Sequence, residues 1–134
     1  MNTKSYIPAF MVLLYLAVLH YYAIIYKWYF HFWWTDVMAH ALGGLWIGLT
    51  VYWLIERFRK VQALSFILST AIIICTTVFI AIGWEIFEFI YKLNESYLPD
   101  IYLYDTVSDI IMAIIGSGIA SIYTNLIQKK NEYR

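Results

Sequence analysis

The chain of 134 residues has one cysteine, two prolines and few charged residues. The single Cys75 excludes an intramolecular disulfide, and its apolar neighbours predict a small buried hydrophobic residue. Charged residues make up 13% of the chain and the formal net charge is zero, so no nucleic-acid partner is expected. Hydrophobic residues make up 63%, which is too many for an ordinary soluble domain and typical of a membrane protein.

Most of the hydrophobic residues lie in long uninterrupted segments. A transmembrane helix needs about 20 mainly apolar residues. Four segments meet this length, at residues 6–26, 35–55, 63–91 and 105–127. Lipid does not tolerate unpaired backbone groups, and no segment alternates like a barrel strand, so all four are predicted to be helices. We therefore predict an all-α fold, with residues 1–134 forming a single transmembrane four-helix bundle in the cell membrane.

The basic residues predict how this bundle is oriented. They follow the second and the fourth span, as Arg57, Arg59 and Lys60 and then Lys129, Lys130 and Arg134. Short loops rich in lysine and arginine stay in the cytoplasm. Both clusters, and with them the amino and carboxyl termini, are predicted to be cytoplasmic.

Three pairs of ionisable residues at helical spacing interrupt the apolar segments. They are Asp36 with His40, Glu85 with Glu88, and Asp105 with Asp109. Ionisable groups inside a membrane are costly and rare, which makes each a candidate for function. The predicted orientation places all three pairs at one depth in the outer leaflet. Small residues such as Gly44 and Gly48 continue the same helix faces and favour close packing, so we expect the pairs to meet in one pocket.

Several carboxylates in one pocket repel each other unless a positive charge is present, and a bound cation would supply it. Carboxylates and histidine at these spacings on facing helices build the metal sites of helix bundles. Such ligands fit a divalent Mg, Mn, Fe, Ca or Zn ion. The predicted metal ligands are Asp36, His40, Glu85, Glu88, Asp105 and Asp109. Asp105 and Glu85 are the predicted catalytic residues, with Asp105 as a ligand or a general base.

Structural interpretations of some of these residues stay open. Asp36 and Asp105 stand where helices are expected to begin and could be N-caps. Glu85 and Glu88 could reach toward the membrane interface. His20 in the first span could be a further ligand, but a hydrogen bond to a backbone carbonyl is the simpler expectation. The segment from residue 94 to 104 could form a lid.

Three short elements resemble a known group of proteins. They are Asp36-x-x-x-His40-x-x-Gly43-Gly44, Gly83-Trp84-Glu85-x-x-Glu88, and Tyr104-Asp105-Thr106-x-x-Asp109 followed by Gly116. Over residues 35–121 the chain is similar to the VanZ-like and YjdF-like small integral membrane proteins. The resemblance implies a multi-pass helical protein of a prokaryotic cell envelope. For VanZ itself it suggests a link with resistance to glycopeptide antibiotics such as teicoplanin.

The leading functional hypothesis is a metal-dependent hydrolase or transferase. A pocket in the outer leaflet is open to membrane lipids, so a lipid or lipid-linked envelope intermediate is the expected substrate. A bound cation there could activate water or polarise a phosphoryl or carbonyl oxygen. A proton- or cation-coupled transporter and a non-catalytic structural membrane subunit are the alternatives. The sequence does not indicate the oligomeric state.

Overall fold

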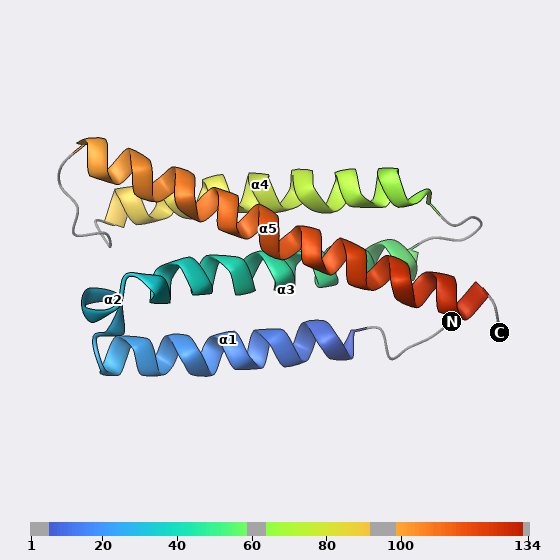
Figure 1. The fold of residues 1–134 in the computed structure, drawn as a ribbon, viewed down its shortest axis with the longest axis horizontal. Coiled ribbons are helices and arrows are strands. Elements are labelled where there is room, and N and C mark those ends of the chain that lie inside the picture. Colours follow the sequence, from blue (N-terminus) through green and yellow to red (C-terminus); the bar gives the residue numbers. More distant parts are fainter. Residues whose placement is uncertain (1–5, 59–63, 92–98, 133–134) are drawn as a thin grey trace.

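The structure is a computed structural model that describes residues 6–58, 64–91 and 99–132. These ranges form helices and contain no strand, which confirms the predicted all-α fold (Figure 1). The helices are α1 (Ile7–Ile25), α2 (Trp28–His31), α3 (Trp34–Phe58), α4 (Phe66–Tyr91) and α5 (Pro99–Glu132). Four of them are long and apolar enough to cross a membrane: α1, α3, α4 and the part of α5 from Tyr102 to Ile127.

The long helices run in alternating directions along one axis (Figure 1). At the end that carries α2, which we call the α2 end, α1 and α4 finish while α3 and α5 begin (Figure 1). Consequently α1 begins and α5 finishes at the opposite end. Arg57 lies in the last turn of α3, at that opposite end. Lys129 and Lys130 lie near the end of α5, whereas Arg59, Lys60 and Arg134 lie outside the described residues.

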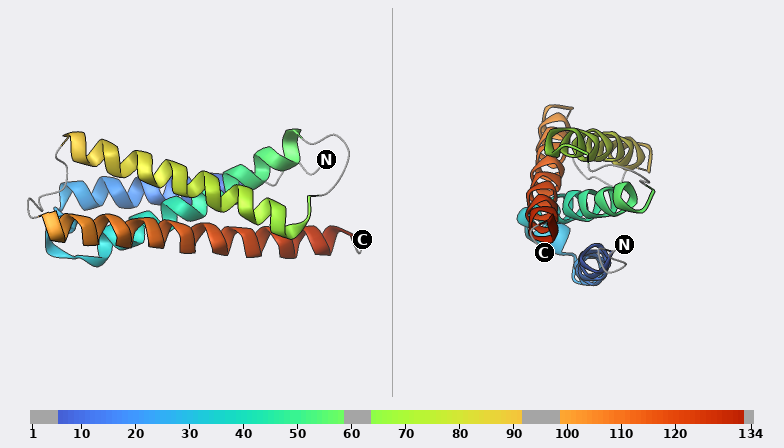
Figure 2. Two further views of the ribbon diagram at one scale, coloured as in Figure 1. Left: turned by 90° about the horizontal axis from the view of Figure 1, so that it is seen from above. Right: turned by 90° about the vertical axis from the view of Figure 1, so that its right-hand side faces the viewer.

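Helix α3 is the centre of the bundle. It packs most extensively against α5 and also contacts α1, α2 and α4. Within the described ranges α1 contacts α3 and α2 but neither α4 nor α5. The end-on view shows α1 beside α3, on the side away from α4 (Figure 2).

Small residues let α3 and α5 approach closely. A Cβ atom on Gly44 would collide with the backbone of Ala113, and one on Gly116 would collide with the backbone of Ala41. One turn further along α3, a Cβ atom on Gly48 would lie 2.6 Å from Cβ of Ala120. The close packing predicted from Gly44 and Gly48 is therefore confirmed.

The large hydrophobic side chains point outward, as expected of helices surrounded by lipid. Ile67 and Phe79 are each 79% exposed, whereas Ile73 and Thr77 on the same helix are fully buried. Cys75 lies between these two buried residues and is exposed, so the prediction that it is buried was wrong. Two residues along a helix correspond to a rotation of about 200°, which turns Cys75 to the outer face. Its apolar neighbours gave no sign of this, because the outer face is as apolar as the core.

The beginning of α5 differs from the sequence prediction. Pro99 is its first residue, a position that suits proline because the missing N–H has no helical partner. Asp105 therefore lies inside the helix and is not an N-cap. Asp36 also follows the start of its helix, in the first turn of α3, where its negative charge is favourable for the helix dipole. Of the segment predicted as a lid, residues 99–104 are helical and residues 94–98 lie outside the described residues.

Candidate metal site

The three ionisable pairs come together at the α2 end of the bundle. The first lies in the opening turns of α3, the second in the closing turns of α4, and the third in the first half of α5. The alternating helix directions place these parts at the same end (Figure 1). We call this group the α2-end cluster; its members are Asp36, His40, Glu85, Glu88, Asp105 and Asp109.

His40 connects the helices within the cluster. Its Nε2 atom lies 3.6 Å from Oδ1 of Asp36, one turn earlier on α3, and 3.8 Å from Oδ2 of Asp109 on α5. The Asp109 side chain is 2% exposed and that of His40 10%. Two ligands of one Zn²⁺ or Mg²⁺ ion, each about 2.1 Å from the metal, can lie at most about 4.2 Å apart. Both distances fit a pair of ligands on a single ion.

His40 also belongs to a second set of close ligand atoms. One ligand atom from each of His40, Glu85 and Glu88 lies within 4.8 Å of the others, and the same limit holds for the set of His40, Asp36 and Asp109. The first set joins α3 to α4 and the second is shared between α3 and α5. His40 thus links all three helices through atoms that can bind a metal.

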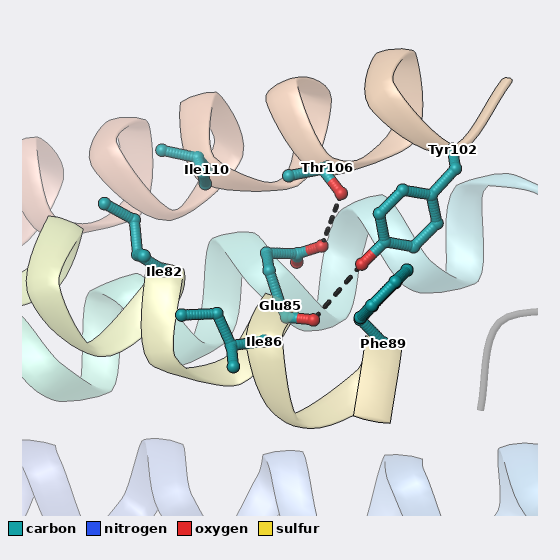
Figure 3. A pocket seen from close by; sticks show the side chains of 7 residues that line it. All are labelled: Ile82, Glu85, Ile86, Phe89, Tyr102, Thr106 and Ile110. Carbon is teal, nitrogen blue, oxygen red and sulfur yellow. Dashed lines mark hydrogen bonds between the residues drawn. The ribbon is translucent and has the colours of Figure 1, made fainter. Parts of the chain in front are cut away.

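Glu85 has one carboxylate oxygen that is paired and one that is not. Its Oε2 atom accepts a hydrogen bond of 2.8 Å from the Thr106 hydroxyl (Figure 3). Its Oε1 atom is buried and has no hydrogen-bond partner among the described residues. The Tyr102 hydroxyl donates to the backbone oxygen of Glu85 and anchors α4 to α5 at this level. A buried carboxylate oxygen without a partner is costly, and a cation would satisfy it.

The remaining acids differ in their surroundings. Glu88 accepts a hydrogen bond of 2.9 Å from Nε1 of Trp84, one turn earlier on α4. Asp105 is half-buried and belongs to neither set of close ligand atoms. Its charge nevertheless interacts with those of Asp36 and Asp109, so it lies near both of these residues. The structure therefore brings five of the predicted ligands into the close sets and leaves Asp105 beside them.

Two further residues near the cluster were not predicted to belong together. The hydroxyl of Tyr29, on α2, lies 2.7 Å from Nδ1 of His20 on α1. Burial and the negative charges of Asp36 and Glu88 raise the pKa of Tyr29 to about 12, so its hydroxyl stays protonated at neutral pH. The prediction that His20 bonds to a backbone carbonyl was wrong, because its partner is the Tyr29 hydroxyl. Nothing in the spacing of the sequence links the two residues, because the turn before α2 brings them together.

The cluster is rich in negative charge and poor in positive charge. No lysine or arginine occurs in residues 34–56, 66–91 or 99–127, the parts of α3, α4 and α5 that surround it. His40 is the one basic side chain among its members. Oxygen ligands with a single imidazole are the donor set of many divalent cation sites.

Comparison with known proteins places the chain in a family. No curated protein and no solved structure matches it. Residues 2–130 match the family described as "Predicted membrane protein (DUF2238)". This confirms a family of small membrane proteins, while the VanZ-like and YjdF-like kinship stays a prediction. Since the match spans nearly the whole sequence, the chain belongs to the DUF2238 family of predicted membrane proteins.

Proposed function

We propose that the α2-end cluster binds a divalent cation and uses it to hydrolyse or transfer a group of a lipid or lipid-linked substrate. The observation that carries the proposal is the buried Oε1 atom of Glu85, which has no hydrogen-bond partner among the described residues although its carboxylate belongs to a close set of ligand atoms. Five side chains are the proposed ligands: Asp36, His40, Glu85, Glu88 and Asp109.

The distances favour a small site for one ion, bound by His40 and by carboxylates of the two close sets. Ca²⁺ prefers six to eight oxygen ligands and Mg²⁺ keeps several waters. The imidazole at the centre of both sets favours Fe or Zn over these two, while the carboxylates also suit Mn. Asp36, the most exposed of the residues paired with His40, has a side chain that is 35% exposed. It is the point at which water or a substrate oxygen can reach the ion.

The proposed chemistry assigns different roles to the acids. A bound cation would polarise a phosphoryl or ester carbonyl oxygen and stabilise the negative charge that develops on it. Asp105, beside the close sets and half-buried, is positioned to accept a proton from the attacking water and to return it to the leaving oxygen. Glu85 is held by Thr106 and fixes the ion relative to α5.

The orientation proposed for the bundle places this chemistry on the outer side of the membrane. The basic residues at the opposite end support cytoplasmic termini. A lipid or lipid-linked envelope intermediate can then reach the α2 end sideways from the outer leaflet. Kinship with VanZ-like and YjdF-like proteins would agree with a role in the cell envelope.

The proposal predicts a stoichiometric metal and a metal-dependent activity. Protein purified in detergent should contain a divalent metal by elemental analysis, and the variant carrying both His40→Ala and Asp109→Ala should contain none above background. In lipid vesicles the unmutated protein should release a product from lipid substrates, and a chelator should abolish the release. No metal in the unmutated protein would remove the proposal. Bound metal without any lipid product would support the metal site but reject the proposed hydrolase or transferase activity.

A proton- or cation-coupled transporter is the second candidate, because buried hydroxyl groups continue from the cluster toward the opposite end. They are Thr77, Ser117, Ser121 and Thr124. Three of these hydroxyls donate to backbone oxygens of their own helices: Thr77, Ser117 and Thr124. The hydroxyls of Thr70 and Ser121 bond to each other between α4 and α5.

Transport predicts that the protein moves ions across a membrane. Vesicles containing the protein and a fluorescent pH indicator should show proton or cation flux, and Glu85→Gln should abolish it because the amide can no longer release a proton. Ser117→Ala removes one hydroxyl of the row but none of the acids, and it should only slow the flux. If vesicles that contain the protein show no more proton or cation flux than protein-free vesicles, this second candidate is rejected.

A further inference from the structure

An open groove lies between α4 and α5, next to the α2-end cluster. Its volume is about 300 Å³. Residues from one stripe of each helix line it: Ile82, Glu85, Ile86 and Phe89 on α4, and Tyr102, Thr106 and Ile110 on α5 (Figure 3). Three of the lining residues on α4 are exposed on the outside of the bundle, namely Ile82, Ile86 and Phe89. The groove therefore opens sideways into the hydrocarbon of the membrane.

The groove and the cluster share Glu85. The Thr106 hydroxyl donates a hydrogen bond to the Glu85 carboxylate and so connects α5 to α4 at the groove. One turn nearer the α2 end, the Tyr102 hydroxyl makes a second connection by donating to the backbone oxygen of Glu85. Both hydroxyls already donate to Glu85, so the surface left to an occupant is hydrocarbon. A volume of about 300 Å³ holds roughly ten groups the size of a water molecule, at about 30 Å³ each. This is the size of a segment of an acyl chain, not of a whole lipid.

We propose that this groove holds the acyl chain of an anionic membrane lipid whose headgroup lies at the α2-end cluster. Lipid chains are the apolar molecules that surround a transmembrane helix, and a concave surface binds one of them better than a flat helix face does, because it buries more of the chain. The headgroup part rests on the proposed function, since a cation among the acids is what would attract a negative charge. The chain part stands on the groove alone.

The test uses a phosphatidylglycerol with a photoreactive diazirine in its acyl chain, mixed into phosphatidylcholine vesicles that contain the full chain. After irradiation, mass spectrometry should find the label on α5 at Thr106 and Ile110, well above the label at Ile119, which is 55% exposed on the same helix. Ile86→Trp should fill the groove and abolish the α5 label. Ile90→Trp adds the same side chain one turn away, at a residue that is exposed and does not line the groove, and should leave the label unchanged.

Ile82→Trp is a second filling variant, and it should give the same loss if Ile86→Trp does not fold. Equal labelling of Ile110 and Ile119, or labelling that survives both filling variants, would overturn the proposal.

The headgroup is tested separately with a matched phosphatidylcholine probe. With Mn²⁺ present, the phosphatidylglycerol probe should label α5 more strongly than the phosphatidylcholine probe, and His40→Ala should remove the difference. Equal labelling by both probes overturns the headgroup assignment. If the probes label the groove as expected but the protein binds no metal, the proposed function is rejected while the acyl-chain site is retained. The failure of one proposal can therefore be distinguished from the failure of the other.

Discussion

Replacing His40 with alanine should lower the affinity for a divalent cation by about 100-fold or more. Removing even an outer residue that supports a metal ligand costs about 10- to 100-fold in affinity, and His40 is itself the side chain that belongs to both close sets. No other imidazole belongs to either set. Titration of the purified protein with Mn²⁺ or Zn²⁺, followed by calorimetry or equilibrium dialysis, measures this loss.

His31→Ala is the matched control for this prediction. His31 lies at the same end of the bundle, on α2, and is exposed. Its removal should leave cation affinity unchanged, and the metal-free thermal stability of both variants should stay near that of the unmutated protein. Equal affinity of His40→Ala and the unmutated protein would show that the cation, if bound, is held elsewhere.

Gly116→Ala should destabilise the bundle, whereas Gly118→Ala should not. A Cβ atom at position 116 would collide with the carbonyl group of Ala41 and lie 2.8 Å from the backbone nitrogen of Leu45, so α3 and α5 must move apart. A Cβ atom at position 118 would meet no atom of the described residues within 4 Å. Overpacking costs about 1–3 kcal/mol, and alanine regains up to about 1 kcal/mol of helix propensity at either position.

Unfolding in mixed detergent micelles, followed by circular dichroism, measures both variants. The expected order of stability is Gly118→Ala at or above the unmutated protein, with Gly116→Ala clearly below it. Gly44→Ala and Gly43→Ala repeat the comparison on α3, because position 44 faces the backbone of Ala113 and position 43 faces open space. Equal stability within each pair would mean that α3 and α5 do not approach as closely as described.

The sequence was sufficient to predict the helices and the helix faces that meet. Long apolar segments with few charges can only be helices in lipid, and this constraint does not depend on neighbouring helices. The spacing of four residues from Asp36 through His40 to Gly44 placed small and polar residues on one face. That face is buried against α5 in the structure, because only small residues allow the backbones to approach.

The arrangement within the cluster could not be predicted in the same way. Spacing along one helix shows which residues share a face, but not how far each side chain reaches into the space between helices. Asp105 and Asp109 share a face of α5, yet only Asp109 belongs to a close set of ligand atoms. Tyr29 and the hydrogen bond from Thr106 to Glu85 depend on how α2 and α5 pack against their neighbours, which a single sequence does not encode locally.

The start of α5 was mispredicted because Asp105 suits an N-cap, whereas the helix begins at Pro99. The surface position of Cys75 was mispredicted for a different reason. In a membrane protein both the core and the lipid-facing surface are apolar, so hydrophobicity alone does not distinguish the inside from the outside. The groove between α4 and α5 was missed on the same ground. Ile82, Ile86 and Ile110 are as apolar as the residues of any other lipid-facing surface. Only the packing of α4 against α5 makes the surface that they form concave.

The most direct test of a shared cation site is anomalous diffraction from crystals grown with Mn²⁺. We expect an anomalous peak within bonding distance of Nε2 of His40 and of carboxylate oxygens from both α4 and α5. Such a peak would unite side chains that lie up to 73 positions apart in the sequence, from Asp36 to Asp109. Crystals in which these side chains pair with one another while manganese binds elsewhere, or not at all, would contradict this expectation.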